Sequence, residues 1–163
     1  MSTAIRPAVP ADLPFLHACV VALAAEEELP ERVDATEDDL AAALFADRPL
    51  VEAAVAEAEG SPVGCALFGL RYSTVAGRPT LHLEDLYVTP AGRGRGVGTD
   101  LLRHLAREAH ARDCARFEWW VLTTNTGARR LYARVGGREL DEIRVVRLAG
   151  DALAAFAVDA RLS

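Results

Sequence analysis

The chain has 163 residues, of which 51% are hydrophobic, and its formal net charge is −6. This length suits one domain with a buried core, and this hydrophobicity excludes an intrinsically disordered protein. The acidic balance argues against nucleic acid as a partner, and the apolar runs are too short to cross a membrane. We therefore expect a single domain over residues 1–163 that binds neither nucleic acid nor a membrane.

The hydrophobic periodicity changes several times along the chain. It predicts, in chain order, a strand at 5–9, helices at 13–23 and 36–45, strands at 50–58, 62–73 and 80–88, a helix at 97–112, a strand at 115–122, a helix at 125–135 and a strand at 144–148. Three consecutive strands followed by helix–strand units predict an α/β (α+β) fold, with a mixed sheet and helices on both faces.

A glycine-rich segment, residues 93–98, separates the strand at 80–88 from the helix at 97–112. Main-chain N–H groups at such a turn, with the positive end of the helix behind them, form a cradle for a phosphate. A dinucleotide-binding fingerprint does not fit, because Val97 and Thr99 stand where it requires glycine. A P-loop does not fit either, because the chain has no lysine. The pattern that fits is Arg93-x-x-Gly96-x-Gly98.

This pattern, after an acidic and hydrophobic strand, resembles the acetyl-CoA site of GNAT-superfamily N-acetyltransferases. The segments Leu83–Val88 and Asn125–Tyr132 are similar to those of the diamine (spermidine/spermine-type) and thialysine N-acetyltransferase branch, and the likeness covers nearly the whole chain. It implies the GNAT acyl-CoA N-acyltransferase fold, whose middle strands splay apart. It also implies acetyl-CoA as co-substrate, no metal, and a homodimer.

The resemblance assigns the cofactor site to three segments. The diphosphate of CoA would lie on the main chain of the glycine turn, the pantetheine arm beside the preceding strand, and part of the cofactor against the helix after Asn125. The residues implied are Leu86, Tyr87, Val88, Arg93, Gly94, Arg95, Gly96, Val97, Gly98, Thr99, Asn125, Gly127 and Ala128.

Two residues are candidates for proton transfer. Glu84, on the strand beside the cofactor arm, can accept the proton of the amine, with His82 on the same nominal face. Tyr132 occupies the place of the tyrosine that protonates the CoA thiolate in the family. Asp85 should point to the opposite face unless a bulge intervenes, and a structural role is the interpretation that we prefer for it. A main-chain N–H of Leu86–Val88 is the candidate donor to the oxyanion.

A cationic amine calls for carboxylates and aromatic faces at the acceptor side. The candidates are Glu26, Glu27, Glu84, Glu118, Trp119 and Glu142. The acidic pair at 26–27 can equally be a solvated loop, and only one of the adjacent Trp119 and Trp120 can face the core of a strand.

Four positions depart from the branch, all near the acceptor side. Glu26 stands in place of an aromatic residue, Thr124 and Ile143 in place of tryptophan, and Gly127 in place of proline. The acceptor is therefore open among polyamines, diamines, lysine-like amines, aminoglycosides and other xenobiotic amines. A catalytically inactive CoA-binding sensor or regulatory module is a further alternative.

The cysteines and the N-terminus indicate the cellular compartment. Cys19, Cys65 and Cys114 are odd in number and far apart, which favours reduced thiols over a disulfide framework or a metal site. The N-terminus has neither the basic start nor the apolar stretch of a signal peptide. We expect a cytoplasmic protein.

Overall fold

The computed structural model describes residues 3–27 and 33–158, and its centre is a five-stranded sheet in the order β1-β2-β3-β4-β5. The strands are β1 (Ala4–Pro7), β2 (Glu52–Ala58), β3 (Ser61–Ser73), β4 (Arg78–Val88) and β5 (Arg116–Trp119). The first four pair antiparallel, whereas β4 and β5 pair parallel. The predicted mixed sheet is confirmed.

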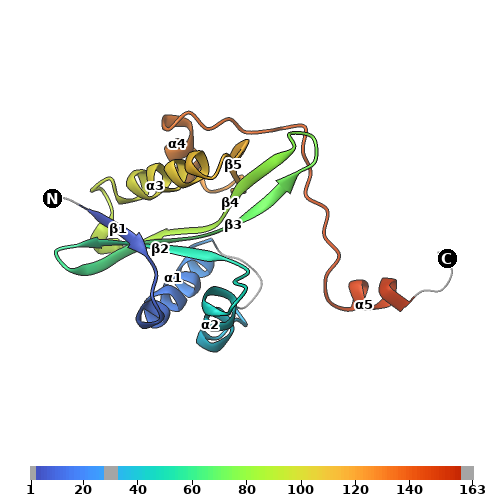
Figure 1. The fold of residues 1–163 in the computed structure, drawn as a ribbon, viewed down its shortest axis with the longest axis horizontal. Helices are drawn as coiled ribbons and strands as arrows, with labels where there is room; N and C mark the ends of the chain where they lie inside the picture. Colours follow the sequence, from blue (N-terminus) through green and yellow to red (C-terminus); the bar gives the residue numbers. More distant parts are fainter. Residues whose placement is uncertain (1–2, 28–32, 159–163) are drawn as a thin grey trace.

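Helices cover both faces of this sheet (Figure 1). One face carries α1 (Leu13–Glu26) and α2 (Glu37–Phe45), and the other carries α3 (Val97–Ala111) and α4 (Thr126–Arg134). Two short 3-10 turns, η1 (Pro10–Asp12) and η2 (Pro90–Gly92), precede α1 and α3. Thr36 caps α2 through a reciprocal pair of hydrogen bonds with Asp39, as a capping box predicts.

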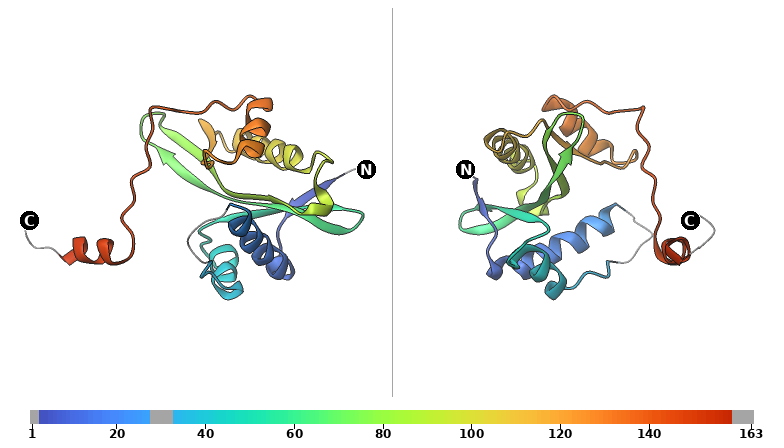
Figure 2. Two further views of the ribbon diagram at one scale, coloured as in Figure 1. Left: turned by 180° about the vertical axis from the view of Figure 1, so that it is seen from behind. Right: turned by 45° about the vertical axis from the view of Figure 1, so that its right-hand side comes forward.

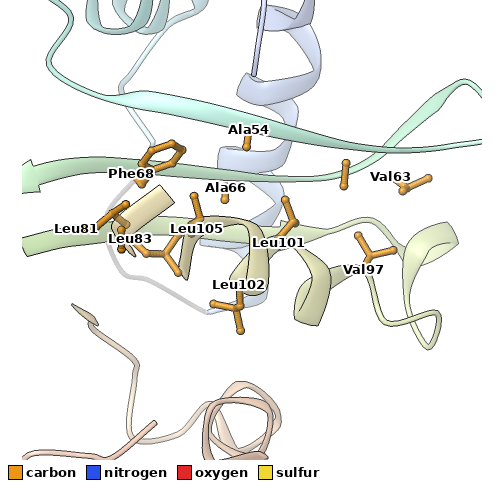
Figure 3. Close-up of a cluster of buried hydrophobic side chains, with 12 residues drawn as sticks. Ala54, Val63, Ala66, Phe68, Leu81, Leu83, Val97, Leu101, Leu102 and Leu105 are labelled. Atoms are coloured by element: carbon orange, nitrogen blue, oxygen red, sulfur yellow. The ribbon is translucent and has the colours of Figure 1, made fainter. Parts of the chain in front are cut away.

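Two buried clusters hold the layers together, one on each face of the sheet. The cluster under α3 includes Leu81, Leu101 and Leu105, each with no exposed surface (Figure 3). The cluster under α1 and α2 includes Leu16, Val55 and Cys65. Because residues of one strand alternate between faces, neighbours such as Val55 and Ala56 belong to different clusters.

The register of β4 is interrupted at Glu84. Asp85 pairs with Leu67 and Leu83 with Phe68, so Glu84 is an extra residue, a β-bulge. The pairing of β4 with β5 ends at Leu83 and Trp119, although β4 continues to Val88. Within the described part of the chain, the β5-facing edge of β4 beyond Leu83 has no partner strand. The predicted splay lies at this point.

The predicted strand at 144–148 is wrong. These residues have no regular structure, and they lead to α5 (Gly150–Val158), which projects from the body of the protein (Figure 2). A strand needs a neighbour for its main-chain hydrogen bonds, and this segment leaves the sheet instead of returning to β5. Apolar side chains of this segment and of α5 are exposed, among them Val146 at 91% and Phe156 at 56%.

Candidate active site

The glycine turn between β4 and α3 has an open main chain. Gly94 and Gly96 have φ values of +73° and +82°, a left-handed conformation that residues with a Cβ rarely adopt. A Cβ placed at either glycine would meet no atom within 4 Å, so the space above the turn is free. Gly96 is the N-cap of α3, whose first N–H groups have no side-chain cap. This arrangement fits a diphosphate on the main chain at the positive end of a helix.

Arg93 at the start of the turn is bound to its own protein. Its NH2 group donates to both carboxylate oxygens of Glu26, at 2.6 and 2.7 Å, and its Nε donates to the carbonyl of Val88 at 3.0 Å. Its guanidinium lies 5.6 Å from the ring centroid of Tyr87, whose hydroxyl donates to Glu26 at 3.2 Å. The turn is therefore tied to the end of α1, the helix on the other face of the sheet.

The predicted pantetheine site lies on the free edge of β4. Leu86 and Val88 pack toward α3, and Tyr87 is buried on the α1 face, so their main-chain groups are the parts that an extended ligand can pair with. On the opposite side of the splay, the Asn125 side chain accepts a hydrogen bond from the Ala128 N–H at 3.0 Å and caps α4. Leu131 of α4 lies against Gly98 of the turn.

The bulge at Glu84 brings two adjacent acidic residues of β4, Glu84 and Asp85, to the α1 face, where Glu27 at the end of α1 adds a third. Asp85 faces this side together with its cross-strand partner Leu67, which belongs to the α1 cluster. Burial, together with the charges of Glu84 and Glu27, raises the pKa of Asp85 to about 6. Glu84 is more exposed and lies 3.6 Å from His82 Nε2. The structure thus places Asp85, a carboxylate with a raised pKa, beside Glu84, the predicted base.

His82 forms the buried floor beside these acids. It is 8% exposed, and its Nδ1 has no hydrogen-bond partner among the described residues. Buried polar atoms without a partner are rare in native proteins and often belong to functional sites. The ring of Trp120 meets the His82 ring edge-on, with centroids 5.1 Å apart.

Tyr132 lies on α4 at the other wall of the splay. Its ring packs against Trp119 with centroids 5.0 Å apart, and burial followed by the charge of Glu27 raises its pKa. Because Glu27 influences both Asp85 and Tyr132, the end of α1 lies close to both residues. A tyrosine with a raised pKa stays protonated at neutral pH and can donate its proton.

The other predicted acceptor-side residues do not gather in one place. Glu27 and Glu84 lie near Asp85, but Glu26 is engaged by Arg93. Trp119 packs against Phe117 and Tyr132 on the α3 face. Trp120, which sequence analysis could not tell apart from Trp119 as the core residue, is the tryptophan that contacts His82.

Two further predicted acceptor-side residues lie apart from the acids at the bulge. Glu118 of β5 lies 3.5 Å from Arg71, and Glu142 is exposed in the segment that leads to α5. No group of His, Cys, Asp and Glu suited to hold a metal ion occurs among the described residues, and no helix there is long and apolar enough to cross a membrane.

A splayed sheet with a glycine turn at the start of a helix is typical of acyl-CoA-dependent transferases. Residues 19–137 match the acetyltransferase (GNAT) family, and the chain belongs to it; it is a GNAT N-acetyltransferase. The chain is 36% identical to thialysine N-epsilon-acetyltransferase of Sus scrofa over 149 residues, which cover 86% of this chain and 87% of that protein. It is also 28% identical to the L-ornithine N5-acetyltransferase of Arabidopsis thaliana. This match covers 96% of this chain and 88% of that protein.

Solved structures agree in fold. An integron cassette protein from the mobile metagenome of V. cholerae superposes with a TM-score of 0.79 at 25% identity, over 97% of this chain and 99% of that one. An aminoglycoside acetyltransferase from an uncultured soil metagenomic sample gives a TM-score of 0.75 at 15% identity, over 91% and 97%. The second likeness concerns the fold alone.

Proposed function

We propose that the protein transfers an acetyl group from acetyl-CoA directly to a primary amine of a small cationic substrate, which is a polyamine, a diamine or a lysine-like amine. The observation that carries this proposal is the bulge at Glu84. It turns two adjacent carboxylates toward the end of α1, at the point where β4 parts from β5. The relatives that act on thialysine and on L-ornithine support the same substrate class.

The acids at the bulge bind the amine and provide an acceptor for its proton. A primary ammonium has a pKa near 10.4, so its free base at pH 7 costs about 4–5 kcal/mol. Glu84 accepts the proton, and Asp85, whose pKa is near 6, is ionised at pH 7 and adds to the negative potential that draws the cation in. Glu27 contributes a third charge from the end of α1.

The splay and the turn hold the acyl donor. The N–H groups of Gly94 to Thr99 bind its diphosphate, and the free edge of β4 at Leu86–Val88 aligns the pantetheine arm. When bound there, acetyl-CoA supplies the activated thioester. A main-chain N–H of β4 donates to the oxygen on which negative charge develops, and Tyr132 gives its proton to the departing sulfur.

A thiol-release assay with acetyl-CoA tests this function. The amines to compare are putrescine, spermidine, lysine, ornithine and an aminoglycoside, with the product identified by mass spectrometry. We expect release that depends on a diamine, a polyamine or a lysine-like amine. Binding of CoA by calorimetry without turnover of any amine would instead support the inactive-module alternative.

We also propose a cytoplasmic homodimer. The exposed apolar side chains of the segment 140–158, which stand away from the body, support a contact with a second copy. A C2 dimer would bury this segment of both copies at once. Glu142 lies within it, so the predicted role of this residue depends on where the segment docks.

A further inference from the structure

One face of the sheet carries a row of polar side chains next to the acidic cluster. Paired residues of adjacent strands share a face, which places His82 with Glu118 and, two residues along β4, Thr80 with Arg71 and Arg116. This is the same face as that of Asp85, on the far side of His82 from the bulge. Glu84 lies four residues from Thr80, roughly 13 Å along the strand.

Arg71 and Glu118 lie side by side on this face without being locked together. Their closest atoms are 3.5 Å apart, and their side chains are 55% and 36% exposed. By contrast, Arg129 and Glu139 form two hydrogen bonds at 2.8 Å. A loose pair keeps donors on the arginine and acceptors on the glutamate available to a ligand.

The second arginine of the row points elsewhere. The NH2 group of Arg116 donates to Ser73 Oγ at 3.0 Å, near the β3–β4 hairpin. Arg71 instead extends toward Glu118, which is the cross-strand partner of His82. It is therefore the arginine of this face that can reach a molecule held at the acids.

The surface between the two ends is aromatic. His82 is buried, whereas Trp120 beside it is 57% exposed, so the indole offers an apolar wall over the buried ring. A short methylene chain packs well on such a wall. Three kinds of group therefore follow one another along this face of β4. The carboxylates at the bulge come first, the rings of His82 and Trp120 second, and the charged pair Arg71 and Glu118 third.

We infer that Arg71 and Glu118 bind the head group of an α-amino acid whose side-chain amine is acetylated at the bulge. Arg71 donates to the α-carboxylate with its planar fork, and Glu118 accepts from the α-ammonium. The methylene chain lies along Trp120, and the ω-ammonium reaches Glu84. This inference rests on the proposed function and narrows it to basic amino acids of the lysine and ornithine size.

Three substrates separate the contribution of the α-carboxylate from that of the α-ammonium. Lysine carries both groups, cadaverine lacks only the carboxylate, and 6-aminohexanoate lacks only the α-amine. We expect the wild-type protein to acetylate the ω-nitrogen of lysine with a kcat/KM about 10–100-fold above that for cadaverine, since hydrogen bonds to charged groups are among the stronger ones.

The variant Arg71→Gln should remove this preference. Its kcat/KM for lysine and for 6-aminohexanoate should fall about 10–100-fold, while that for cadaverine changes by less than about threefold. Glu118→Gln should bring lysine down toward 6-aminohexanoate. Arg78→Gln, an exposed arginine of the same hairpin that pairs with Asp113, is the matched control and should retain the wild-type preference.

The outcomes separate the two proposals. If no amine is acetylated, the proposed function fails. If amines are acetylated but cadaverine equals or exceeds lysine, if the α-nitrogen is the product site, or if Arg71→Gln lowers all three substrates alike, the inference alone is overturned. Circular dichroism and the melting temperature of each variant show that it is folded.

Discussion

Both carboxylate oxygens of Glu26 accept hydrogen bonds from the guanidinium of Arg93, at 2.6 and 2.7 Å. The two residues are 67 positions apart and belong to opposite ends of the site: Glu26 ends α1 beside the predicted acceptor segment, and Arg93 opens the cofactor turn. The pair is backed by Tyr87, which donates to the same carboxylate. Glu26, which sequence analysis assigned to the substrate, is thus placed to hold the turn in position.

This contact predicts a defect in cofactor binding for Glu26→Gln. Bidentate pairing is lost, and we expect the KM for acetyl-CoA to rise about 3–10-fold with little change in kcat, since the pair is half exposed and worth about 1 kcal/mol. Steady-state kinetics with each substrate varied in turn measure this. The neighbouring Glu27→Gln is the matched variant, and it should raise the KM for the amine. An increase in amine KM for Glu26→Gln, with acetyl-CoA KM unchanged, would contradict the assignment.

Tyr132→Phe should lower kcat about 10²–10⁴-fold, because it removes the proton donor for the thiolate. The phenyl ring keeps the contact with Trp119, so CoA affinity by calorimetry should remain within about twofold of the wild type. Phe117→Leu alters the other aromatic neighbour of Trp119 without removing a hydroxyl and serves as the control. Full activity of Tyr132→Phe would exclude this tyrosine as the acid.

The ionised carboxylate of Asp85 should lower the stability of the folded protein while it favours the reaction. Its pKa is about 6 in the folded protein and near 3.8 ordinarily, so the folded state binds this proton more tightly than the unfolded chain does. The free energy of unfolding therefore falls as the pH rises from about 4 to 6 and stays reduced above that range. We expect Asp85→Asn to be more stable than the wild type by about 1–3 kcal/mol at pH 8, and the gain to vanish near pH 4.

Urea unfolding at the two pH values measures this difference. Asp47→Asn, the same change at an exposed position, is the control and should show no pH-dependent gain. A gain for Asp85→Asn that is equal at both pH values would mean that a cause other than ionisation is at work. The same variant should acetylate more slowly, because it removes charge beside the bound ammonium.

The sequence predicted the elements whose causes are local. Glycines at 94 and 96 mark the left-handed turn, and alternation around Leu81 and Leu83 marks the central strand. Sequence analysis left a bulge near Asp85 open but could not decide whether it is present, since a bulge is a property of the register between β3 and β4. This bulge decides where Asp85 points. The contact of Glu26 with Arg93 was equally hidden, because it joins residues from opposite faces of the sheet.

The C-terminal error has a different origin. Residues 144–148 contain two adjacent valines, which favour a strand, but this preference produces a strand only where a sheet edge is available to pair with it. The segment leaves the sheet after α4, so the edge is absent within one copy of the described chain. In the dimer that we propose, a second copy could supply the missing edge.

The core cluster under α3 should dominate the stability of the fold. Leu105 has no exposed surface, and Leu105→Ala should lower the free energy of unfolding by about 2–5 kcal/mol through lost burial and a residual cavity. Leu50→Ala makes the same change at a side chain that is 82% exposed, and should stay within about 0.5 kcal/mol of the wild type. Chemical denaturation of both variants tests this, and equal losses would contradict the assignment of the core.

The proposed dimer predicts that charge on the projecting segment separates the copies. The double variant Val146→Asp, Phe156→Asp places two carboxylates where apolar surface would be buried, and burying unpaired charge costs several kcal/mol. We expect light scattering after size exclusion to report a dimer for the wild type and a monomer for this variant. Val75→Asp, at an equally exposed valine on the β3–β4 hairpin, is the control and should remain dimeric. A wild-type monomer, or a double variant that stays dimeric, would show that this segment does not join two copies.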